Sequence, residues 1–435
     1  MPKIIGSETF DVRFPTSKML DGSDAMNQDP DYSAAYLRIK TDSSRLYGDS
    51  LVFTIGRGND LQVTAINMLV EKVNGLDVED TFSNIGQIAQ ELSSDSQIRW
   101  LGPDYGVFHM GAGAVLNALW DLFAKTRELP LWKLLSDMSP EKIVSVIDFR
   151  YICDALSPND ALKILGEAEV QKNANERMLL QKGLPAYTTS PGWLGYSDEK
   201  MLDLTRQALD DGFGLIKYKC GHSLEDDRRR LGKVRALVGP DFPIAIDANQ
   251  VWDVEQAIAW INALQEYRLT WVEEPTSPND VLGHSRIAKE VSPTPIATGE
   301  MASSRIIFKQ LLQAKAISVM QIDSTRVAGV NENLANILLA AKFSIPVCPH
   351  AGGVGLCEMV QHLAMWDAVA VTGHHNRRVV EYVNHLHHHF LEPVLIKQGN
   401  YMAPRLPGSG AEMHQKSIDD YSYPGGAYWN GEDVA

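Results

Sequence analysis

The sequence predicts an α/β protein in which a closed parallel (β/α)8 barrel follows a smaller α+β domain. Beyond about residue 141, eight short apolar runs alternate with helical patterns, and most neighbouring runs begin about 23 to 34 residues apart. That spacing is the length of one βα unit, and eight such units in series favour a closed barrel over an open sheet. The first 140 or so residues differ, because strands there are followed by helices.

Composition narrows the class of protein. The chain has 435 residues, 44% hydrophobic and 22% charged, with a formal net charge of −15. This apolar content excludes a disordered or collagen-like chain, and the acidic balance argues against nucleic acid or an anionic membrane as a partner. No apolar run reaches the ~18 residues of a membrane helix, and the N-terminus leads into a strand pattern rather than a signal peptide. The four cysteines form no CxxC pair, which predicts reduced thiols in a cytoplasmic protein.

Residues 1–140 are predicted to form a capping domain. Strand character is expected at Ile4–Phe14, Ala34–Asp42 and Leu51–Ile55, and an amphipathic helix at Gly111–Thr126. Between the first two strands lies Pro15–Ser33, a long polar stretch. Loops of this length are uncommon in compact domains and often serve as lids, so we expect it to cover a ligand. A disordered surface insertion is the alternative.

The barrel is predicted over residues 141–390. Its strands are expected at Ile143–Tyr151, Gly214–Lys219, Pro243–Asp247, Leu269–Glu273, Pro295–Glu300, Ser318–Asp323, Ile345–His350 and Val379–Val383. The longer gap after the first strand ends in LPAYTTSPGWLGYSDEK, whose Gly, Pro and Ser content predicts a loop. Residues 391–435 form a Pro/Gly-rich tail, whose aromatic residues predict that it packs back on the capping domain.

The second predicted barrel strand carries two lysines on one face. In LIKYK, Lys217 and Lys219 are two residues apart, so both project into the barrel. Burial and mutual repulsion would depress the pKa of such a lysine and make it a usable base near neutral pH. The pattern KxK is common, however, and a register shifted by one residue would leave both lysines in solvent.

The next three predicted strands each end in a carboxylate. Asp247, Glu273 and Glu300 are about one βα unit apart and would meet at the C-terminal mouth, where barrel active sites lie. Any one of them could be an ordinary acidic strand end, but three in consecutive units favour a divalent cation. An all-oxygen ligand set points to Mg²⁺ rather than zinc. On the fourth strand Glu273 is chosen because Trp271 shares its face, whereas Glu274 is expected to point outward.

The last three predicted strands complete a ring of polar residues. The sixth ends at Asp323 and the seventh at His350, so the carboxylate could orient the imidazole as a general acid or base. Glu381, on the eighth, could hydrogen-bond a substrate. The run NHLHHHF follows that strand and is expected in a loop or on the surface. The AGGVG segment after His350 lacks the GK[ST] of a phosphate loop and predicts a tight turn.

These residues resemble the enolase superfamily and, within it, the mandelate racemase subgroup. The matching pieces are KYK on the second strand, the acidic residues on the next three, and the Asp–His pair on the sixth and seventh. The segment ALWDLFAK…PLWKLL resembles the one that joins the subgroup's capping domain to its barrel, and the resemblance covers essentially the whole chain. Three loops, LDGSDAMNQDPDYSAAY, YTTSPGWLGYSDEK and PHAGGVGLCE, resemble those of the subgroup's acid-sugar dehydratases that act on L-fuconate.

The resemblance implies an enolase-like barrel and a Mg²⁺-dependent hydro-lyase that converts L-fuconate to its 2-keto-3-deoxy product. Asp247, Glu273 and Glu300 would bind the metal and, through it, the substrate carboxylate. Lys219 would take the C2 proton. Lys217 would lower the pKa of Lys219 and contact the substrate carboxylate.

The remaining roles follow from the same resemblance. His350, held by Asp323, would protonate the departing C3 hydroxyl, and Glu381 would hydrogen-bond the substrate carboxylate. The loop between the first two strands would close over the polyol end of the substrate and set specificity, through Gly22, Ser23, Asp24 and Tyr32.

Two alternatives remain open at the level of sequence. The same residues permit dehydration of another acid sugar, or racemisation or epimerisation at C2 with Lys219 and His350 on opposite faces. A non-catalytic protein that binds sugar acids is the alternative from another class, although an intact set of site residues argues against it. The expected partner is a small acid-sugar substrate, with no nucleic acid and no membrane; a homo-oligomer is left open.

Overall fold

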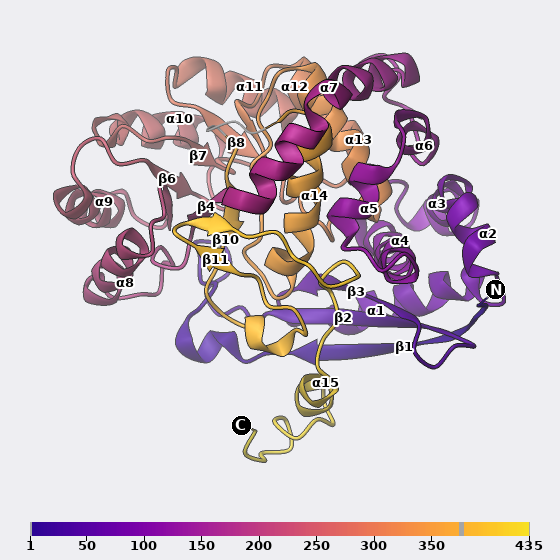
Figure 1. Cartoon of the computed structure of the whole chain (residues 1–435). Helices are drawn as coiled ribbons and strands as arrows, with labels where there is room; N and C mark the ends of the chain where they lie inside the picture. Colours follow the sequence, from indigo (N-terminus) through magenta and orange to yellow (C-terminus); the bar gives the residue numbers. More distant parts are fainter. Residues whose placement is uncertain (1, 374–377, 435) are drawn as a thin grey trace.

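The computed structural model describes residues 2–373 and 378–434, and it has an antiparallel cap beside a parallel barrel (Figure 1). The cap sheet has the order β1-β2-β3, formed by β1 (Ile4–Arg13), β2 (Ser33–Thr41) and β3 (Tyr47–Thr54). These are the three strands predicted from the sequence, although the third begins four residues earlier. The cap helices are α1 (Asn59–Val70), α2 (Val78–Ser83), α3 (Ile85–Ser93) and α4 (Gly106–Thr126).

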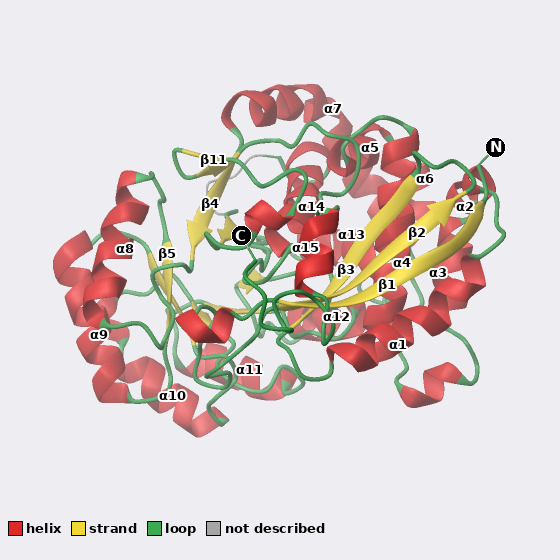
Figure 2. Cartoon of the chain, turned by 90° about the horizontal axis from the view of Figure 1, so that it is seen from below, coloured by secondary structure: helices red, strands yellow, loops and turns green. Residues whose placement is uncertain are grey.

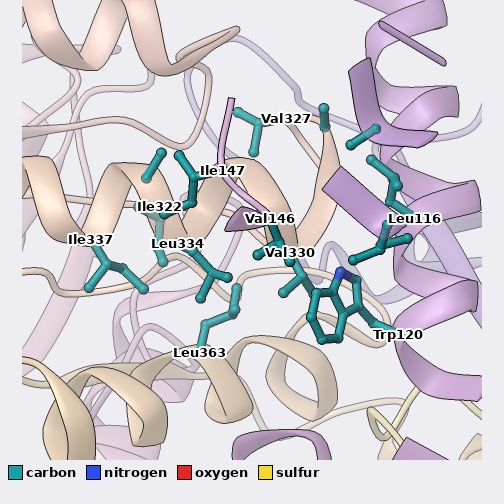
Figure 3. Close-up of a cluster of buried hydrophobic side chains, with 14 of the residues drawn as sticks. Leu116, Trp120, Val146, Ile147, Ile322, Val327, Val330, Leu334, Ile337 and Leu363 are labelled. Atoms are coloured by element: carbon teal, nitrogen blue, oxygen red, sulfur yellow. The ribbon is translucent and has the colours of Figure 1, made fainter. Parts of the chain in front are cut away.

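Helix α4 connects the cap to the barrel. It is long and apolar enough to cross a membrane by length and composition, but 83% of its apolar window is buried inside the protein, as in a core helix. Figure 3 shows Leu116 and Trp120 of α4 beside Val330 and Leu334 of α13 (Gly329–Lys342). At Gly113 an added Cβ would lie 2.3 Å from the carbonyl oxygen of Val327, so glycine allows this close approach.

The barrel is closed, which confirms the predicted fold class. Its parallel strands follow the order β4 (Leu184–Thr188), β5 (Ile216–Lys219), β6 (Ile244–Asp247), β7 (Val272–Glu273), β8 (Ile296–Thr298) and β9 (Val319–Met320). Segment 345–350 joins β9 through a parallel bridge between Met320 and Val347. The backbone N–H of Glu381, in β10 (Val380–Tyr382), donates to Pro349, and β10 pairs with β4 to complete the ring.

A ring of helices covers the outside of the barrel (Figure 2). After α13, the chain continues through segment 345–350 into α14 (Leu356–Ala370). The helices between the earlier strands are α8 (Asp198–Asp210), α9 (Leu224–Val238), α10 (Val254–Ala263), α11 (Val281–Glu290) and α12 (Arg305–Gln313).

The prediction for the first barrel strand was wrong. The apolar run at 143–147 begins within α6 (Pro140–Ser145), which follows α5 (Leu131–Asp137) and precedes α7 (Pro158–Lys182). Ser139–Pro140 and Ser157–Pro158 are helix-start signals, because each serine side chain caps the helix and each proline occupies its first turn. The first strand is β4, the LPAYT that the sequence assigned to a loop; the Pro/Gly/Ser-rich loop begins only after it.

The C-terminal tail runs from the barrel to the cap. After a 3₁₀ turn at His387–His389, the hairpin of β11 (Ile396–Lys397) and β12 (Asn400–Tyr401) adds to β4. Helix α15 (Gln415–Tyr421) then packs against β1 on the outer side of the cap sheet (Figure 1). Lys125 of α4 forms ion pairs with Asp49 of β3 and Glu412 of the tail. The four cysteines, all among the described residues, form no disulfide, and three of them are buried; the cytoplasmic location inferred from them stays a prediction.

Candidate active site

The register of the parallel strands brings the predicted polar residues to one level. Lys219 on β5 pairs with Asp247 on β6, and Asp247 pairs with Glu273 on β7. Because neighbouring residues in a parallel ladder point the same way, these side chains all project into the barrel at its C-terminal mouth. The register that places Glu273 inside is therefore the one predicted.

Asp247, Glu273 and Glu300 form a cluster able to hold a cation. One oxygen from each lies within 4.8 Å of the other two. Oε2 of Glu300 is buried and accepts no hydrogen bond from the described residues. Burial and the neighbouring carboxylates raise the pKa of Glu273 to about 8, although Lys217 opposes them. A buried acceptor without a donor and a set of mutually repelling carboxylates fit a divalent cation, and the oxygen-only set fits Mg²⁺.

Two neighbours hold Glu273 in place. Its Oε2 accepts hydrogen bonds from Trp271 Nε1 at 3.1 Å and Gln321 Nε2 at 2.7 Å. Glu274 was expected to point outward, but it is fully buried in protein. Its backbone has φ 44°, and its Oε2 accepts from Gln250 Nε2 at 2.7 Å. The left-handed turn directs this carboxyl group back into protein, where burial holds its pKa well above the usual range.

Lys217 lies beneath the cavity rather than in its wall. It is fully buried, with Nζ 2.5 Å from Oε1 of Glu273, 3.0 Å from Oε1 of Glu381 and 3.6 Å from Oδ2 of Asp247. Although burial opposes it, the first two of these carboxylates raise the lysine's pKa well above its ordinary value. Lys217 is therefore a buried counter-ion, and the geometry does not support its predicted contact with substrate.

Lys219 reaches the cavity wall and pairs with Asp247, with 2.5 Å between Nζ and Oδ2. The sequence predicted a depressed pKa for this lysine, and the structure gives the opposite direction. Burial and Lys217 do lower the pKa, but Asp247 and Glu300 raise it by more. The sequence argument counted the second lysine without the carboxylates around both.

His350 and Asp323 form the predicted pair. Nδ1 of His350 donates to Oδ2 of Asp323 at 2.8 Å, while Nε2 lies 3.5 Å from Oε2 of Glu300. The other oxygen of Asp323 accepts from the backbone N–H groups of Thr325 and Arg326, which fixes the carboxylate. Burial opposes protonation of the imidazole, but Glu300 and Asp323 together raise its pKa to about 9. The imidazole can therefore donate a proton at neutral pH.

Glu381 lies in the cavity wall, between Lys217 on one side and His350 on the other. One oxygen accepts a hydrogen bond from Thr189 Oγ1, and the other accepts from the backbone N–H of Ala351 at 2.9 Å. Burial alone would raise its pKa, but Lys217 and His350 lower it to about 2. Glu381 is therefore a charged acceptor beside His350, whose Nε2 lies 4.0 Å away.

The cavity above these residues has a volume of about 360 Å³, and the loop of residues 16–32 forms part of its wall. Of the four predicted loop residues, Gly22, Asp24 and Tyr32 line the cavity. Ser23 does not, contrary to the prediction. Its hydroxyl donates to the carbonyl of Leu20 at 2.6 Å and accepts from the N–H of Gly195 at 3.0 Å. Its polar atoms are thus engaged in anchoring the loop.

Sequence reasoning missed several residues of the cavity wall. Trp193 comes from the loop after β4, and its ring centroid lies 5.5 Å from Nζ of Lys219. Arg326 lies three residues after Asp323, and its place just after a predicted strand end was the available signal. Other wall residues carried no such signal, because the cap brings them to the barrel: Phe53, Thr54, Ile55, Arg57 and Met110.

The histidine run is a loop, as predicted, but most of it is not on the surface. His385 lies beside the rings of Tyr32 and Trp193, with centroid distances of 5.4 and 6.3 Å. His389 is buried against Phe14 at 4.4 Å. The imidazoles support the cavity wall and the tail from behind.

The cap, the barrel and this ring of lysine, carboxylate and histidine side chains define an enolase-type protein. Residues 200–417 match the family described as Enolase C-terminal domain-like, and the chain belongs to the enolase superfamily. The crystal structure of human Mitochondrial enolase superfamily member 1 superposes with a TM-score of 0.97 at 49% identity, covering 99% of this chain and 98% of that one.

Two further proteins are similar to this chain. An L-galactonate dehydratase from Hypocrea jecorina is 47% identical over 98% of this chain and 96% of its own length. The crystal structure of L-talarate/galactarate dehydratase from Salmonella typhimurium LT2, liganded with Mg and L-lyxarohydroxamate, shares the fold. Its TM-score is 0.74 at 24% identity, over 96% of this chain and 92% of that one.

Proposed function

We propose that this chain is a Mg²⁺-dependent sugar-acid dehydratase that converts L-fuconate to 2-keto-3-deoxy-L-fuconate. One observation carries the proposal. Lys219, Glu300 and the His350–Asp323 pair line a single cavity, with Asp247 and Glu273 buried next to them. This arrangement combines a base, an acid and a cation site around space for one small substrate.

Lys219 is the proposed base for the C2 proton. Its ammonium lies in the cavity wall, held by Asp247, so a substrate whose carboxylate reaches the triad presents C2 nearby. A Mg²⁺ ion bound there would supply positive charge that holds the substrate carboxylate, stabilises the charge growing on it, and offsets the carboxylates that raise the pKa of Lys219. Lys217 balances the buried charge of Glu273 and Glu381 beneath the site.

His350 is the proposed acid for the C3 hydroxyl. Its raised pKa keeps the imidazole protonated at neutral pH, and Asp323 fixes its orientation. Proton transfer from His350 turns the C3 hydroxyl into water as the C3–O bond breaks, and the electron pair from C2 forms the C2–C3 double bond. The resulting enol ketonises to the 2-keto-3-deoxy acid. After one turnover Lys219 has gained a proton and His350 has lost one, so exchange with solvent resets both.

The wall that the cap supplies supports a substrate with an apolar end. Met26, Ile55 and Met110 place apolar side chains on the cap side of the cavity. L-Fuconate ends in a methyl group at C6, where L-galactonate carries a hydroxymethyl group. Apolar contacts reject an added hydroxyl by only about 10²-fold, and the cap side of the cavity also carries the polar Thr54 and Arg57, so we expect L-galactonate to be a slower substrate of the same site.

A panel of acid sugars incubated with Mg²⁺ tests the proposal. We expect a 2-keto-3-deoxy product from L-fuconate with the highest kcat/KM, and a lower value for L-galactonate. A higher kcat/KM for L-galactonate or a dicarboxylate would overturn the substrate and keep the reaction class. Absence of ketone from every acid sugar would overturn the reaction class.

A second candidate reaction rests on the placement of two residues. Lys219 and His350 arise from β5 and from segment 345–350, which are well separated around the barrel, so both could reach C2 from opposite faces. That geometry also suits racemisation or epimerisation. The same panel separates the two, because a C2 epimer formed without ketone identifies the epimerase.

A further inference from the structure

Residues 189–196, the loop after β4, touch both the strand that carries Lys219 and the cap loop of residues 16–32. We propose that Arg230 of α9 is a positioning residue for the active site. It holds the 189–196 loop in the shape that places Trp193 in the cavity wall and seats the cap loop over the substrate. The kinetic part of this inference rests on the proposed dehydratase function; the structural part does not.

The guanidinium of Arg230 donates four hydrogen bonds to backbone carbonyls of this loop. The side chain is 4% exposed, and its Nη2 donates to the carbonyls of Gly192 at 3.0 Å and Trp193 at 3.1 Å. Its Nη1 donates to Leu194 at 3.3 Å and Tyr196 at 3.4 Å. A planar, fixed fork of donors suits four carbonyls that curve around it, whereas a lysine ammonium offers three donors at a single point.

The inner side of the loop is joined to the proposed base. The carbonyl of Gly192 also accepts from the backbone N–H of Lys219 at 3.0 Å. A Cβ at Gly192 would lie 2.2 Å from the carbonyl oxygen of Lys217, so this residue must be glycine for the loop to reach β5. Through the same loop the indole of Trp193 faces Nζ of Lys219 across 5.5 Å.

The outer side of the loop is joined to the cap. The N–H of Leu194 donates to the carbonyl of Ser23, and the N–H of Gly195 donates to the Ser23 hydroxyl, each at 3.0 Å. The hydroxyl of Tyr196 donates to Asp21. These three bonds join the cap loop to the barrel immediately beside the cavity-lining residues Gly22 and Asp24.

Arg230 is therefore connected through the 189–196 loop to Lys219 and to the cap loop, although Arg230 itself does not line the cavity. Without its four hydrogen bonds, the loop would lose the shape that presents the N–H groups of residues 194 and 195 to Ser23. Lys219, His350 and the carboxylates would remain in place. Closure over the substrate should suffer more than the chemical step, because lids exclude water and complete binding.

The test is Arg230→Met, with Arg229→Met as the matched control on the same helix. Arg229 is exposed and pairs with Asp198 and Asp226 on the surface. With L-fuconate and Mg²⁺, Arg230→Met should raise KM about tenfold while kcat falls less than about threefold, and Arg229→Met should match the wild type. Arg230→Lys should recover only part of the loss.

A second measurement needs no substrate. Lys18 is exposed within the cap loop, at the 3₁₀ turn Thr16–Met19, and tryptic cleavage after it reports release of that loop. We expect faster cleavage there in Arg230→Met and in Ser23→Ala, which removes the hydrogen bond between the Ser23 hydroxyl and the N–H of Gly195. If Arg230→Met does not fold, Arg230→Lys provides the same test, and Ser23→Ala shows whether cleavage after Lys18 reports the contact between the two loops.

The outcomes separate the two proposals. Wild-type cleavage after Lys18 in folded Arg230 variants overturns the positioning role, whatever the enzyme does. If no acid sugar is dehydrated but cleavage accelerates, the dehydratase function fails and the positioning role stands. A loss confined to kcat with KM unchanged would also overturn the inference, because it would place Arg230 in the chemical step.

Discussion

Nζ of Lys219 lies 2.5 Å from Oδ2 of Asp247, so the proposed base forms an ion pair with a proposed metal ligand. The two roles are therefore linked. Asp247 is the largest of the effects that raise the pKa of Lys219. A cation bound to Asp247 would therefore lower the pKa of this lysine. Binding of the cation should therefore increase the fraction of Lys219 that is deprotonated and able to act as a base.

The first prediction concerns the metal. EDTA should abolish turnover and Mg²⁺ should restore it. Mg²⁺ should also raise the melting temperature, since a ligand at 100 times its Kd stabilises the folded state by ~2.7 kcal/mol. Glu300→Gln should keep the fold and lose this thermal shift. If Mg²⁺ does not change the melting temperature of the wild type, the proposed cation site is wrong.

The second prediction separates two adjacent glutamates. Glu273→Gln removes a carboxylate oxygen of the cluster that would hold the cation, and it should abolish turnover and weaken Mg²⁺ binding. Glu274→Gln should be tolerated, because burial raises the pKa of that carboxyl group well above the usual range and an amide resembles the neutral acid. Steady-state kinetics and Mg²⁺ titrations on both variants provide the check. The reverse pattern would mean that Glu274 is the ligand.

The third prediction concerns the division of labour between base and acid. Lys219→Met should lose both dehydration and exchange of the C2 hydrogen. His350→Asn should still exchange that hydrogen in D₂O, while ketone formation falls by about 10²–10⁴-fold. NMR of recovered substrate measures the exchange. Exchange that survives in Lys219→Met would move the base role to another residue.

The fourth prediction concerns acid stability and a residue that does not line the cavity. Glu332 of α13 is buried beside His109 of α4, at 2.6 Å, and Arg305, at 3.2 Å. Burial alone would raise its pKa, but these two partners lower it to about 2. A lowered folded-state pKa stabilises the protein above the unfolded value of about 4.3, and this contribution is lost as the pH falls toward 2.

Glu332→Gln should therefore reduce the free energy of unfolding at pH 7 by about 3 kcal/mol, the order expected when one partner of a buried pair is removed. The gap between variant and wild type should narrow from about pH 5 downward, because the carboxylate takes up a proton in the unfolded wild-type chain before it does so in the folded one, whose pKa is about 2. Urea unfolding at pH 7, 5 and 3 measures it. A gap that stays constant across this range would refute the assignment.

The strands of the barrel were largely predictable, with one instructive failure. β5 to β8 are short apolar runs bounded by turns, and their spacing is regular enough to reveal the closed barrel. At residues 143–147 an equally apolar run begins in a helix that ends at Ser145 and forms no strand, because the capping serine and proline before it outweigh β-propensity. β4 was missed because its five residues adjoin a long Pro/Gly/Ser-rich loop.

For the site, the two-residue period of a strand was the decisive signal. It placed Lys217 and Lys219 on one face and selected Glu273 over Glu274. The same period does not show how deeply a side chain is buried. It therefore did not reveal that Lys217 is a fully buried counter-ion. The role of Ser23 was missed for a similar reason, since its partner Gly195 is distant in the chain and carries no side chain to suggest a contact.

The sequence alone determined which residues reach the mouth of the barrel, because strand period and βα spacing are local properties of the chain. Only the tertiary structure decided their charge states and their neighbours. The pKa values of Lys219 and His350 depend on carboxylates brought close by closure of the ring, and Coulomb interactions depend on distance through space rather than along the chain. The contact between the cap loop and the 189–196 loop, which Arg230 supports through its hydrogen bonds, likewise forms only when the two domains pack together.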